Sequence, residues 1–362
     1  MKVIITTIIL LTVISGCKNN RSSSGPDAEP DDLITGEFKL DDTAFGETIE
    51  LIGTNISTDA IFTPIESQLA VSDSILILKN SAQANTHIIH ILELPDLKSI
   101  GKIGSPGRGP FEFLFPQLVK STDTSAITYI HELTTGKMYK LTKKYSLQEV
   151  YSPFKPLLGS VENGIVNIST DEYLYVDISL NETRIGRIKH ENTINQNNKT
   201  DILDISFNPQ VKMHQAYQGN LCANSSKNRL VYTYRYYKRV VFSDIYGENI
   251  RTILFPGKEY DVRTYEVPDG ADLNVTHYYD AIAGDEYVYL KYSGREPRYV
   301  REEIEKGVYY MYLEQWDWNG NPLKRYQLDQ QGAIAIDEKN GKIYLVAYNH
   351  EHPFFVYDLP EL

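Results

Sequence analysis

The chain has 362 residues and a formal net charge of −12 at pH 7. That length accommodates two average domains or one large repeat domain. The acidic charge argues against a nucleic-acid-binding protein, because phosphate binding needs a basic surface. Tyrosine accounts for 27 residues, and aromatic side chains favour half-buried strands over helices.

The N-terminus has the features of an export signal. Lys2 precedes residues 3–14, which are apolar but too few to span a bilayer as a helix. Residues 14–17, Ile-Ser-Gly-Cys, resemble the lipobox of bacterial lipoproteins, in which the cysteine thiol accepts a diacylglycerol. This resemblance implies that residues 1–16 are a lipoprotein signal peptide and that Cys17 is lipidated. The alternative is a plain secretory signal in which Cys17 is incidental.

Residues 17–32 are predicted to be a flexible tether, and residues 33–362 the folded domain. The tether is polar and rich in Ser, Pro and Asp, so it cannot bury enough apolar surface to fold. Once Cys17 carries a lipid, Cys222 is the remaining cysteine, and no disulfide within the chain is expected. We therefore predict a protein anchored by lipid in the cell envelope, on the periplasmic side or at the outer-membrane surface.

The folded domain repeats a unit of four short strands. In the first unit, residues 68–78 read as two apolar strands joined by a Ser-Asp-Ser turn, and residues 87–94 and 99–104 read as a third and a fourth strand. Hairpins of the same kind recur along the chain. The predicted units start near Gln68, Gln117, Gly164, Gly219, Asp280 and Gly332.

Units of about 40–55 residues with four strands each are typical of propellers, because one such sheet must stack on its neighbours to bury both faces. We predict an all-β fold, a six-bladed β-propeller of four-stranded antiparallel blades. The last unit ends early, with residues 354–359 as its third strand. An N-terminal strand at Glu47–Gly53 is predicted to complete that blade and close the ring. The alternative fold is an open β-sandwich pair.

A family resemblance lies in residues 101–113, Gly-Lys-Ile-Gly-Ser-Pro-Gly-Arg-Gly-Pro-Phe-Glu-Phe. Together with the lipobox and the acidic linker, they resemble the TolB-like six-bladed β-propeller lipoproteins of the NHL/TolB-like propeller superfamily. The first blade of those proteins often ends in a Gly-Arg-Gly-Pro-Gly-Glu-Phe-type loop. The resemblance covers most of the exported domain and implies its fold, but not an activity. Phe111 stands where the pattern usually has Gly, so a different loop conformation is expected.

Three patterns that could carry chemistry have ordinary structural explanations. Residues 105–110 are rich in glycine but lack the Gly-Lys-Ser/Thr ending of a phosphate-binding loop, so a blade junction is expected there. His350 and His352 flank one glutamate, but Pro353 follows at once, which favours an exposed loop over a metal site. Residues 232–239 interleave aromatic and basic side chains, a pattern also seen in nucleic-acid or sugar binders. The alternation places Tyr232, Tyr234 and Tyr236 on one face of a strand, which favours packing between blades.

A binding site is predicted at the mouth of the central funnel, near the starts of the inner strands. Residues there escape the packing between blades, and loops from every blade converge. His277, Tyr278, Tyr279 and Asp280 offer an imidazole, two aromatic rings and a carboxylate just before an inner strand. The alternative for the two tyrosines is packing against the adjacent blade. The expected neighbours are Gln68, Gln117 and Asn220, with Arg108 on a junction loop nearby, where it could bind a carboxylate.

The sequence favours a binding or scaffold protein that engages an envelope protein, a peptide or a glycan. No catalytic residue or metal ligand is predicted, nucleic acid is not an expected partner, and the cofactor is unknown. The alternative is a propeller enzyme, a metal-assisted hydrolase or lactonase, with its site in the funnel. Because the starts of the inner strands are polar but poor in carboxylates, binding is the favoured function.

Cys17 is predicted to carry the lipid because it is the thiol at the export cleavage site. Metabolic labelling with an alkyne fatty acid should therefore label the wild-type chain and leave the Cys17→Ser variant unlabelled. Continued labelling of that variant would contradict the assignment.

Overall fold

The computed structural model describes residues 33–60, 62–64, 66–80, 87–154, 164–178, 183–191, 196–258, 260–266 and 270–360. Leu33–Leu362 form one compact unit. The predicted signal peptide and tether, with Cys17, lie outside the described residues. In the described ranges, no helix combines the length and the apolar character needed to cross a bilayer.

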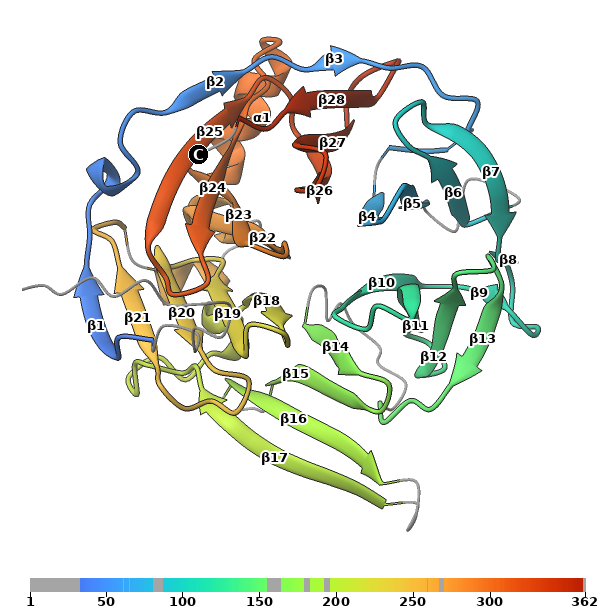
Figure 1. Ribbon diagram of the computed structural model, residues 1–362. Coiled ribbons are helices and arrows are strands. Elements are labelled where there is room, and N and C mark those ends of the chain that lie inside the picture. Colours follow the sequence, from blue (N-terminus) through green and yellow to red (C-terminus); the bar gives the residue numbers. More distant parts are fainter. Residues whose placement is uncertain are drawn as a thin grey trace, which may run out of the picture. The chain divides into compact units, whose positions relative to one another are not determined.

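The described residues form six antiparallel four-stranded blades around a central axis (Figure 1). Each of the first five is a meander of consecutive strands, and the sixth takes its outer strand from the N-terminal region. This confirms the predicted all-β, six-bladed propeller, and the open β-sandwich pair is wrong. The predicted unit starts lie close to the starts of the six innermost strands.

The strands of blades 1 to 3 are given from the axis outwards. Blade 1 contains β4 (Gln68–Ser72), β5 (Ile75–Lys79), β6 (Ile89–Glu93) and β7 (Lys98–Ile103). Blade 2 contains β10 (Pro116–Ser121), β11 (Ala126–Glu132), β12 (Lys137–Thr142) and β13 (Leu147–Val150). Blade 3 contains β14 (Ile165–Ser169), β15 (Glu172–Ile178), β16 (Thr183–Glu191) and β17 (Gln196–Asp204).

Blades 4 to 6 follow in the same order. Blade 4 contains β18 (Gly219–Asn224), β19 (Arg229–Tyr234), β20 (Arg239–Ser243) and β21 (Arg251–Leu254). Blade 5 contains β22 (Thr276–Ala283), β23 (Tyr287–Arg295), β24 (Met311–Asp317) and β25 (Pro322–Leu328). Blade 6 contains β26 (Gly332–Asp337), β27 (Lys342–Ala347), β28 (Phe354–Asp358) and β3 (Thr54–Asn55).

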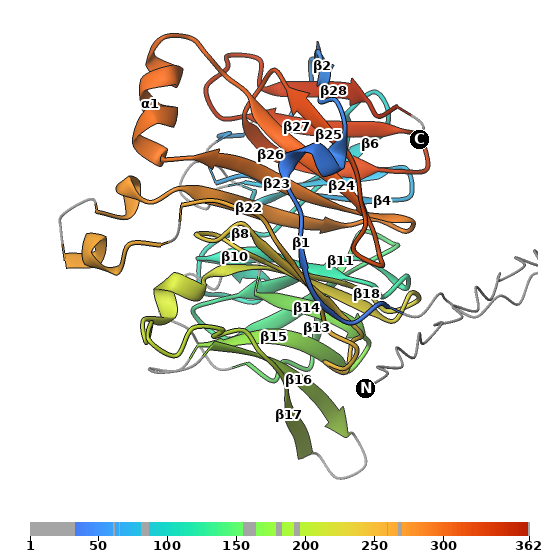
Figure 2. The same ribbon diagram turned by 90° about the vertical axis from the view of Figure 1, so that its left-hand side faces the viewer.

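Helical segments gather at one end of the ring, the left side of Figure 2. They are η2 (His214–Tyr217), η3 (Val262–Glu266), η4 (Gly270–Leu273) and the helix α1 (Pro297–Glu305). α1 lies between β23 and β24, so blade 5 rises further at this end than its sheet alone would.

The hydrophobic core lies between neighbouring blades. On β5, Ile77 packs in a cluster with Ile130 of blade 2, whereas the next residue along the chain, Leu76, packs in a cluster with Val346 of blade 6. Successive residues of a strand point to opposite faces of the sheet, so β5 is buried on both faces.

The tyrosine-rich stretch 232–239 is part of this core, as predicted. Tyr232 and Tyr234 are fully buried and share a cluster with Ile185 of blade 3. Cys222 is buried on the other face of blade 4, and burial raises the pKa of its thiol to about 12. The two tyrosines and Cys222 are therefore structural.

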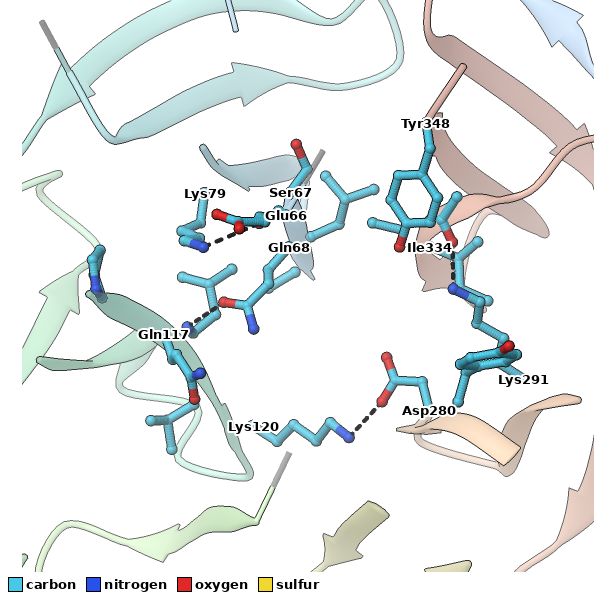
Figure 3. A pocket seen from close by; sticks show the side chains of 18 of the residues that line it. Glu66, Ser67, Gln68, Lys79, Gln117, Lys120, Asp280, Lys291, Ile334 and Tyr348 are labelled. Atoms are coloured by element: carbon cyan, nitrogen blue, oxygen red, sulfur yellow. Dashed lines mark hydrogen bonds and ion pairs between the residues drawn. The ribbon is translucent and has the colours of Figure 1, made fainter. Parts of the chain in front are cut away.

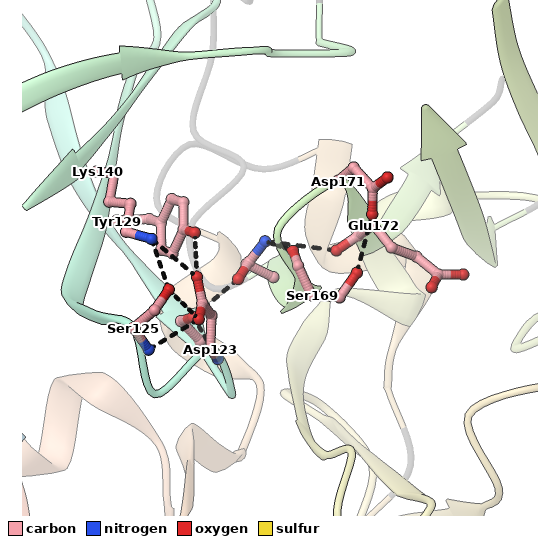
Figure 4. A network of polar contacts seen from close by, with 9 residues as sticks. Asp123, Ser125, Tyr129, Lys140, Ser169, Asp171 and Glu172 are labelled. Atoms are coloured by element: carbon pink, nitrogen blue, oxygen red, sulfur yellow. Dashed lines mark hydrogen bonds and ion pairs between the residues drawn. The ribbon is translucent and has the colours of Figure 1, made fainter. Parts of the chain in front are cut away.

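Aspartates organise the turns of the inner hairpins, which explains why Asp recurs there in the sequence. The carboxylate of Asp123 accepts hydrogen bonds from Ser125 N (2.8 Å) and from the Tyr129 hydroxyl (2.5 Å), as Figure 4 shows. Burial would raise the pKa of Asp123, but these hydrogen bonds and the charge of Lys140 outweigh it and lower the pKa to about 2. The carboxylate is thus a fixed acceptor that closes the turn.

The junction after blade 1 contains two short parallel strands, β8 (Ser105–Pro106) and β9 (Glu112–Phe113). Glu112 accepts a hydrogen bond from Gly109 N at 2.7 Å, and a Cβ atom at Gly107 would lie 2.0 Å from the Glu112 carboxylate. Phe111 adopts a left-handed backbone with φ of 59°, the region that favours glycine. Arg108 is exposed on this loop, which is the predicted blade junction.

The N-terminal residues 36–55, here called the strap, run along the outer edges of blades 4 to 6. β1 (Gly36–Lys39) pairs in parallel with β21, β2 (Ile49–Leu51) pairs in parallel with β25, and β3 pairs antiparallel with β28. Figures 1 and 2 show the strap crossing these blades on their outer side. Each strap strand covers backbone groups that would otherwise form an open edge.

The predicted partner of Glu47–Gly53 is wrong. Its strand, β2, joins blade 5, and the outer strand of the last blade is the shorter β3. β2 joins blade 5 because Ile49 and Leu51 are half-buried against the core cluster that includes Tyr326 and Leu328 of β25. The sequence shows that this segment is a strand, but the edge it pairs with depends on strands remote in the chain.

The helical turn η1 (Asp42–Phe45) anchors the strap between blades 4 and 5. Phe45 is buried, with its ring 5.2 Å from that of Trp316 in an edge-to-face contact. Asp42 forms ion pairs with Lys238 of blade 4 and with Arg325 of blade 5, the latter at 2.6 Å. Arg325 also pairs at 2.8 Å with Glu314, which is fully buried. The anchor therefore combines a buried aromatic side chain with a connected series of ion pairs.

Truncating the buried Phe45 side chain should destabilise the domain. We expect Phe45→Ala to lower the free energy of unfolding by about 3–5 kcal/mol, the usual cost of truncating a buried Phe. The control is Ile52→Ala in the same strap, where the side chain is 75% exposed and the change should stay within about 0.5 kcal/mol. Chemical denaturation measures both variants, and equal stabilities would show that the strap contributes little.

Candidate functional site

A cavity of about 1080 Å³ lies on the axis of the ring. Blades 1, 2, 5 and 6 supply most of its lining, and Arg235 comes from the loop after β19 of blade 4. Figure 3 looks into it and shows side chains from opposite sides of the ring facing one another. Val300 of α1 also lines it, so the cavity lies toward the end of the ring that carries the helical segments.

An ion pair crosses the ring at the cavity. Lys120 of β10 and Asp280 of β22 belong to blades 2 and 5, and their Nζ and Oδ1 atoms are 2.8 Å apart. Lys120 Nζ also lies 3.4 Å from the carbonyl oxygen of Leu221, and Asp280 Oδ1 accepts a hydrogen bond from Ala281 N at 2.8 Å. The side chains are 22% and 27% exposed, so solvent reduces the strength of the pair. Its role is to hold two groups of the lining in place.

One wall of the cavity combines aromatic rings with cations. Lys291 Nζ lies 5.8 Å from the centre of the Tyr279 ring and 5.6 Å from that of Tyr348. The Arg235 guanidinium lies 5.9 Å from the Tyr279 ring. Lys291 also donates to the carbonyl oxygen of Gly332 at 2.5 Å. Blades 4 and 5 thus each place one cation near the aromatic ring of Tyr279, and blade 6 adds Tyr348.

The wall formed by blades 1 and 2 combines apolar side chains with two amides and with the charged residues Glu66, Lys79 and Lys120. Leu69, Leu114 and Leu118 line it, beside Gln68 and Gln117. The Gln68 amide oxygen accepts a hydrogen bond from the backbone of Leu118 at 2.9 Å and so links the two blades. The Gln117 side chain is among those that Figure 3 shows around the cavity.

The cavity contains four of the predicted site residues, namely Gln68, Gln117, Tyr279 and Asp280. Tyr279 and Asp280 both line it because β22 has a bulge there. Tyr278 pairs with Tyr292 and Asp280 pairs with the adjacent Lys291, so Tyr279 is the extra residue. The strict alternation of a regular strand would have separated these neighbours.

The other four predicted residues do not line the cavity; this differs from the expectation for His277, Tyr278 and Asn220, whereas Arg108 was expected on the junction loop. Tyr278 is fully buried, and its hydroxyl donates to Glu314 at 3.1 Å. His277 is also buried, with its ring stacked 6.2 Å from that of Tyr292. Asn220 donates to the carbonyl oxygen of Tyr278 at 3.3 Å and joins blades 4 and 5. Arg108 projects from the exposed junction loop.

The cations of the lining were missed by the sequence reasoning. Lys120 and Lys291 both lie on strands that were predicted. Lys120 is three residues beyond Gln117, and Lys291 pairs with Asp280 in the β22–β23 ladder. A lysine within an otherwise apolar inner strand is the signal that could have identified them. Arg235 lies in a stretch that was read as core packing, so no local pattern marked it.

His350 and His352 lie in the exposed loop between β27 and β28, as expected. The backbone N–H of His352 donates to His350 Nδ1 at 3.1 Å. Among the described residues, no group of three or more His, Cys, Asp or Glu is placed to hold a metal ion.

Comparisons with known proteins concern the fold. The sequence matches the family described as TolB-like 6-blade propeller-like over residues 44–339. A member of the duf4221 family from Bacteroides vulgatus ATCC 8482 is similar over 86% of this chain and 98% of its own, with a TM-score of 0.51 and 11% identity. A protein of Bacteroides fragilis NCTC 9343, whose name gives it as a presumed exported protein, is similar over 90% of this chain and 99% of its own, with a TM-score of 0.49 and 10% identity. No curated protein matches the sequence.

The buried histidine beside the site should make the stability of the fold depend on pH. Burial, with the nearby charge of Lys238, lowers the pKa of His277 from 6.5 to about 4. Between these two values the unfolded chain binds a proton that the folded chain does not, so stability falls as the pH falls. We expect His277→Gln to reduce the loss of unfolding free energy between pH 7 and pH 5 by up to about 2 kcal/mol.

Urea unfolding at the two pH values measures this loss. His350→Gln, in the exposed loop, is the control and should leave the loss as it is in the wild type. An unchanged loss in His277→Gln would contradict the assignment of a neutral, buried imidazole.

Proposed function

The chain belongs to the TolB-like 6-blade propeller-like family, and on that premise we propose that it is an exported, lipid-anchored propeller that binds a ligand in its central cavity. It acts in the cell envelope as a binding or scaffold protein. The N-terminal export signal with Cys17 supports the location, and the cavity on the axis supports the binding role.

The observation that carries this proposal is the composition of the cavity. Its volume of about 1080 Å³ is slightly above the range of about 300–1,000 Å³ that is typical of ligand sites. An apolar wall with a few convergent polar and charged groups is the usual lining of such sites. The lining side chains come from five blades, so the ring of blades presents them on a rigid frame.

The state of Asp280 supports binding over the hydrolase or lactonase alternative. Its carboxylate is held by Lys120 at 2.8 Å and by the backbone N–H of Ala281 at 2.8 Å. Both donors reach the same oxygen, Oδ1, so groups of the protein already engage this carboxylate. It is well suited to orient a ligand or to position Lys120.

Filling the cavity should abolish capture of the ligand. We expect the Gln117→Trp variant of the full chain, immobilised in mild detergent, to lose the component that the wild type captures from native envelope extract. Arg108→Ala, on the exposed loop outside the cavity, is the control and should capture as the wild type does. Melting temperatures confirm that both variants are folded. Undiminished capture by folded Gln117→Trp would place the binding site elsewhere.

A further inference from the structure

We propose that the ligand of the cavity is an acidic peptide segment that also carries apolar side chains. This inference rests on the proposed binding function and adds the chemical class of the ligand. It follows from three features of the lining. These are its excess of positive charge, the position of two cations that lack a carboxylate partner, and the apolar side chains of blades 1 and 2.

The charge of the cavity is opposite to that of the chain. The lining contains five cationic side chains, Lys79, Lys120, Arg235, Lys291 and Arg295, and two carboxylates, Glu66 and Asp280. The whole chain has a net charge of −12. A site that concentrates cations within an acidic surface selects an anionic partner, because like charges placed opposite one another disfavour binding.

Two of these cations have no carboxylate partner among the described residues. Lys120 pairs with Asp280, and Arg295 pairs with Glu303 of α1. Lys79 donates to the backbone carbonyl oxygen of Glu66 at 3.0 Å. Arg235 and Lys291 instead lie 5.9 Å and 5.8 Å from the centre of the Tyr279 ring. Neither forms an ion pair with a described acidic side chain, so both can bind the carboxylates of a ligand.

The two cations that lack a carboxylate partner, Arg235 and Lys291, suit two carboxylates of one ligand. The planar guanidinium of Arg235 can bind a carboxylate through two parallel hydrogen bonds, and the ammonium of Lys291 acts as a point charge. Both cations approach the same aromatic ring, that of Tyr279, so the carboxylates of one short peptide can reach both. Neighbouring Asp or Glu side chains along a peptide would supply such carboxylates.

The apolar wall distinguishes a peptide from a phosphate or an acidic sugar. Leu69, Leu114 and Leu118 line this wall, together with Phe115, which is 59% exposed. Aliphatic side chains of this kind bind aliphatic or aromatic groups by excluding water. An acidic sugar would leave these surfaces without an apolar partner. A peptide offers both kinds of group on one chain.

Selection from a random octapeptide library tests the ligand class directly. We expect the full chain in mild detergent to enrich sequences that combine Asp or Glu with Leu, Ile or Phe. The affinity of a selected peptide, measured by fluorescence anisotropy, should weaken several-fold between 50 and 300 mM NaCl, because salt screens the ion pairs. Oligogalacturonate, an acidic sugar without apolar groups, is the comparison ligand and should bind at least about tenfold more weakly.

Variants of the two free cations test the site. We expect Arg235→Gln combined with Lys291→Gln to weaken binding of the selected peptide at least tenfold. Lys144→Gln combined with Lys189→Gln removes the same charge from exposed positions outside the cavity and should leave binding unchanged. Arg235→Lys combined with Lys291→Arg keeps both charges and should retain most of the affinity. Melting temperatures establish that each variant is folded.

The outcomes separate this inference from the proposed function. Enrichment of neutral or basic peptides whose binding is lost in Gln117→Trp would overturn the acidic class and leave the cavity as the binding site. Tighter binding of oligogalacturonate than of any peptide, if it is lost in Gln117→Trp, would overturn the peptide class and leave an anionic ligand in the cavity. Peptide binding that survives Gln117→Trp would overturn both the ligand class proposed here and the cavity as the binding site. Failure to enrich any peptide would overturn the peptide class, while capture from envelope extract would still test the cavity.

Discussion

A blade of this propeller cannot bury its two faces by itself, and this constraint determines the rest of the structure. Ile77 and Leu76 are neighbours on β5, yet they pack in different clusters, one shared with blade 2 and the other with blade 6. Each blade therefore depends on two neighbours, and a ring is the arrangement in which every blade has both. The same packing explains the fully buried tyrosines, because a large ring fills the space between twisted sheets.

The ring leaves strand edges on its outside, and the strap covers three of them. Its strands pair with β21, β25 and β28, so one continuous segment links blades 4, 5 and 6. Phe45 and Asp42 fix its position between blades 4 and 5. Burial raises the pKa of Glu314 below this contact, and Arg325 compensates by pairing with that carboxylate. The buried charges thus form a connected group, in which removal of one member would leave another unpaired.

Residues that face the axis are free of the packing between blades, and the cavity can therefore be polar where the core cannot. It holds the Lys120–Asp280 pair, which joins blades 2 and 5 across the propeller, and the Tyr279 ring with Arg235 and Lys291 close to it. All of these groups except Arg235 lie on strands that pack in the core. A preformed site of this kind requires little ordering when a ligand binds, which favours affinity. The positive charge of the cavity in an acidic protein is the basis of the proposed preference for anions.

The sequence by itself determined the number of blades and the positions of their inner strands, because apolar alternation and Asp-containing turns are local properties of the chain. Gln68, Gly219 and Gly332 were predicted as unit starts, and each is the first residue of an inner strand. Tertiary structure decided what depends on a remote partner. It placed β2 on blade 5, it formed the bulge that turns both Tyr279 and Asp280 toward the axis, and it buried His277 and Tyr278. Lys120 meets Asp280 for the same reason, since the closure of the ring brings together residues that are 160 positions apart.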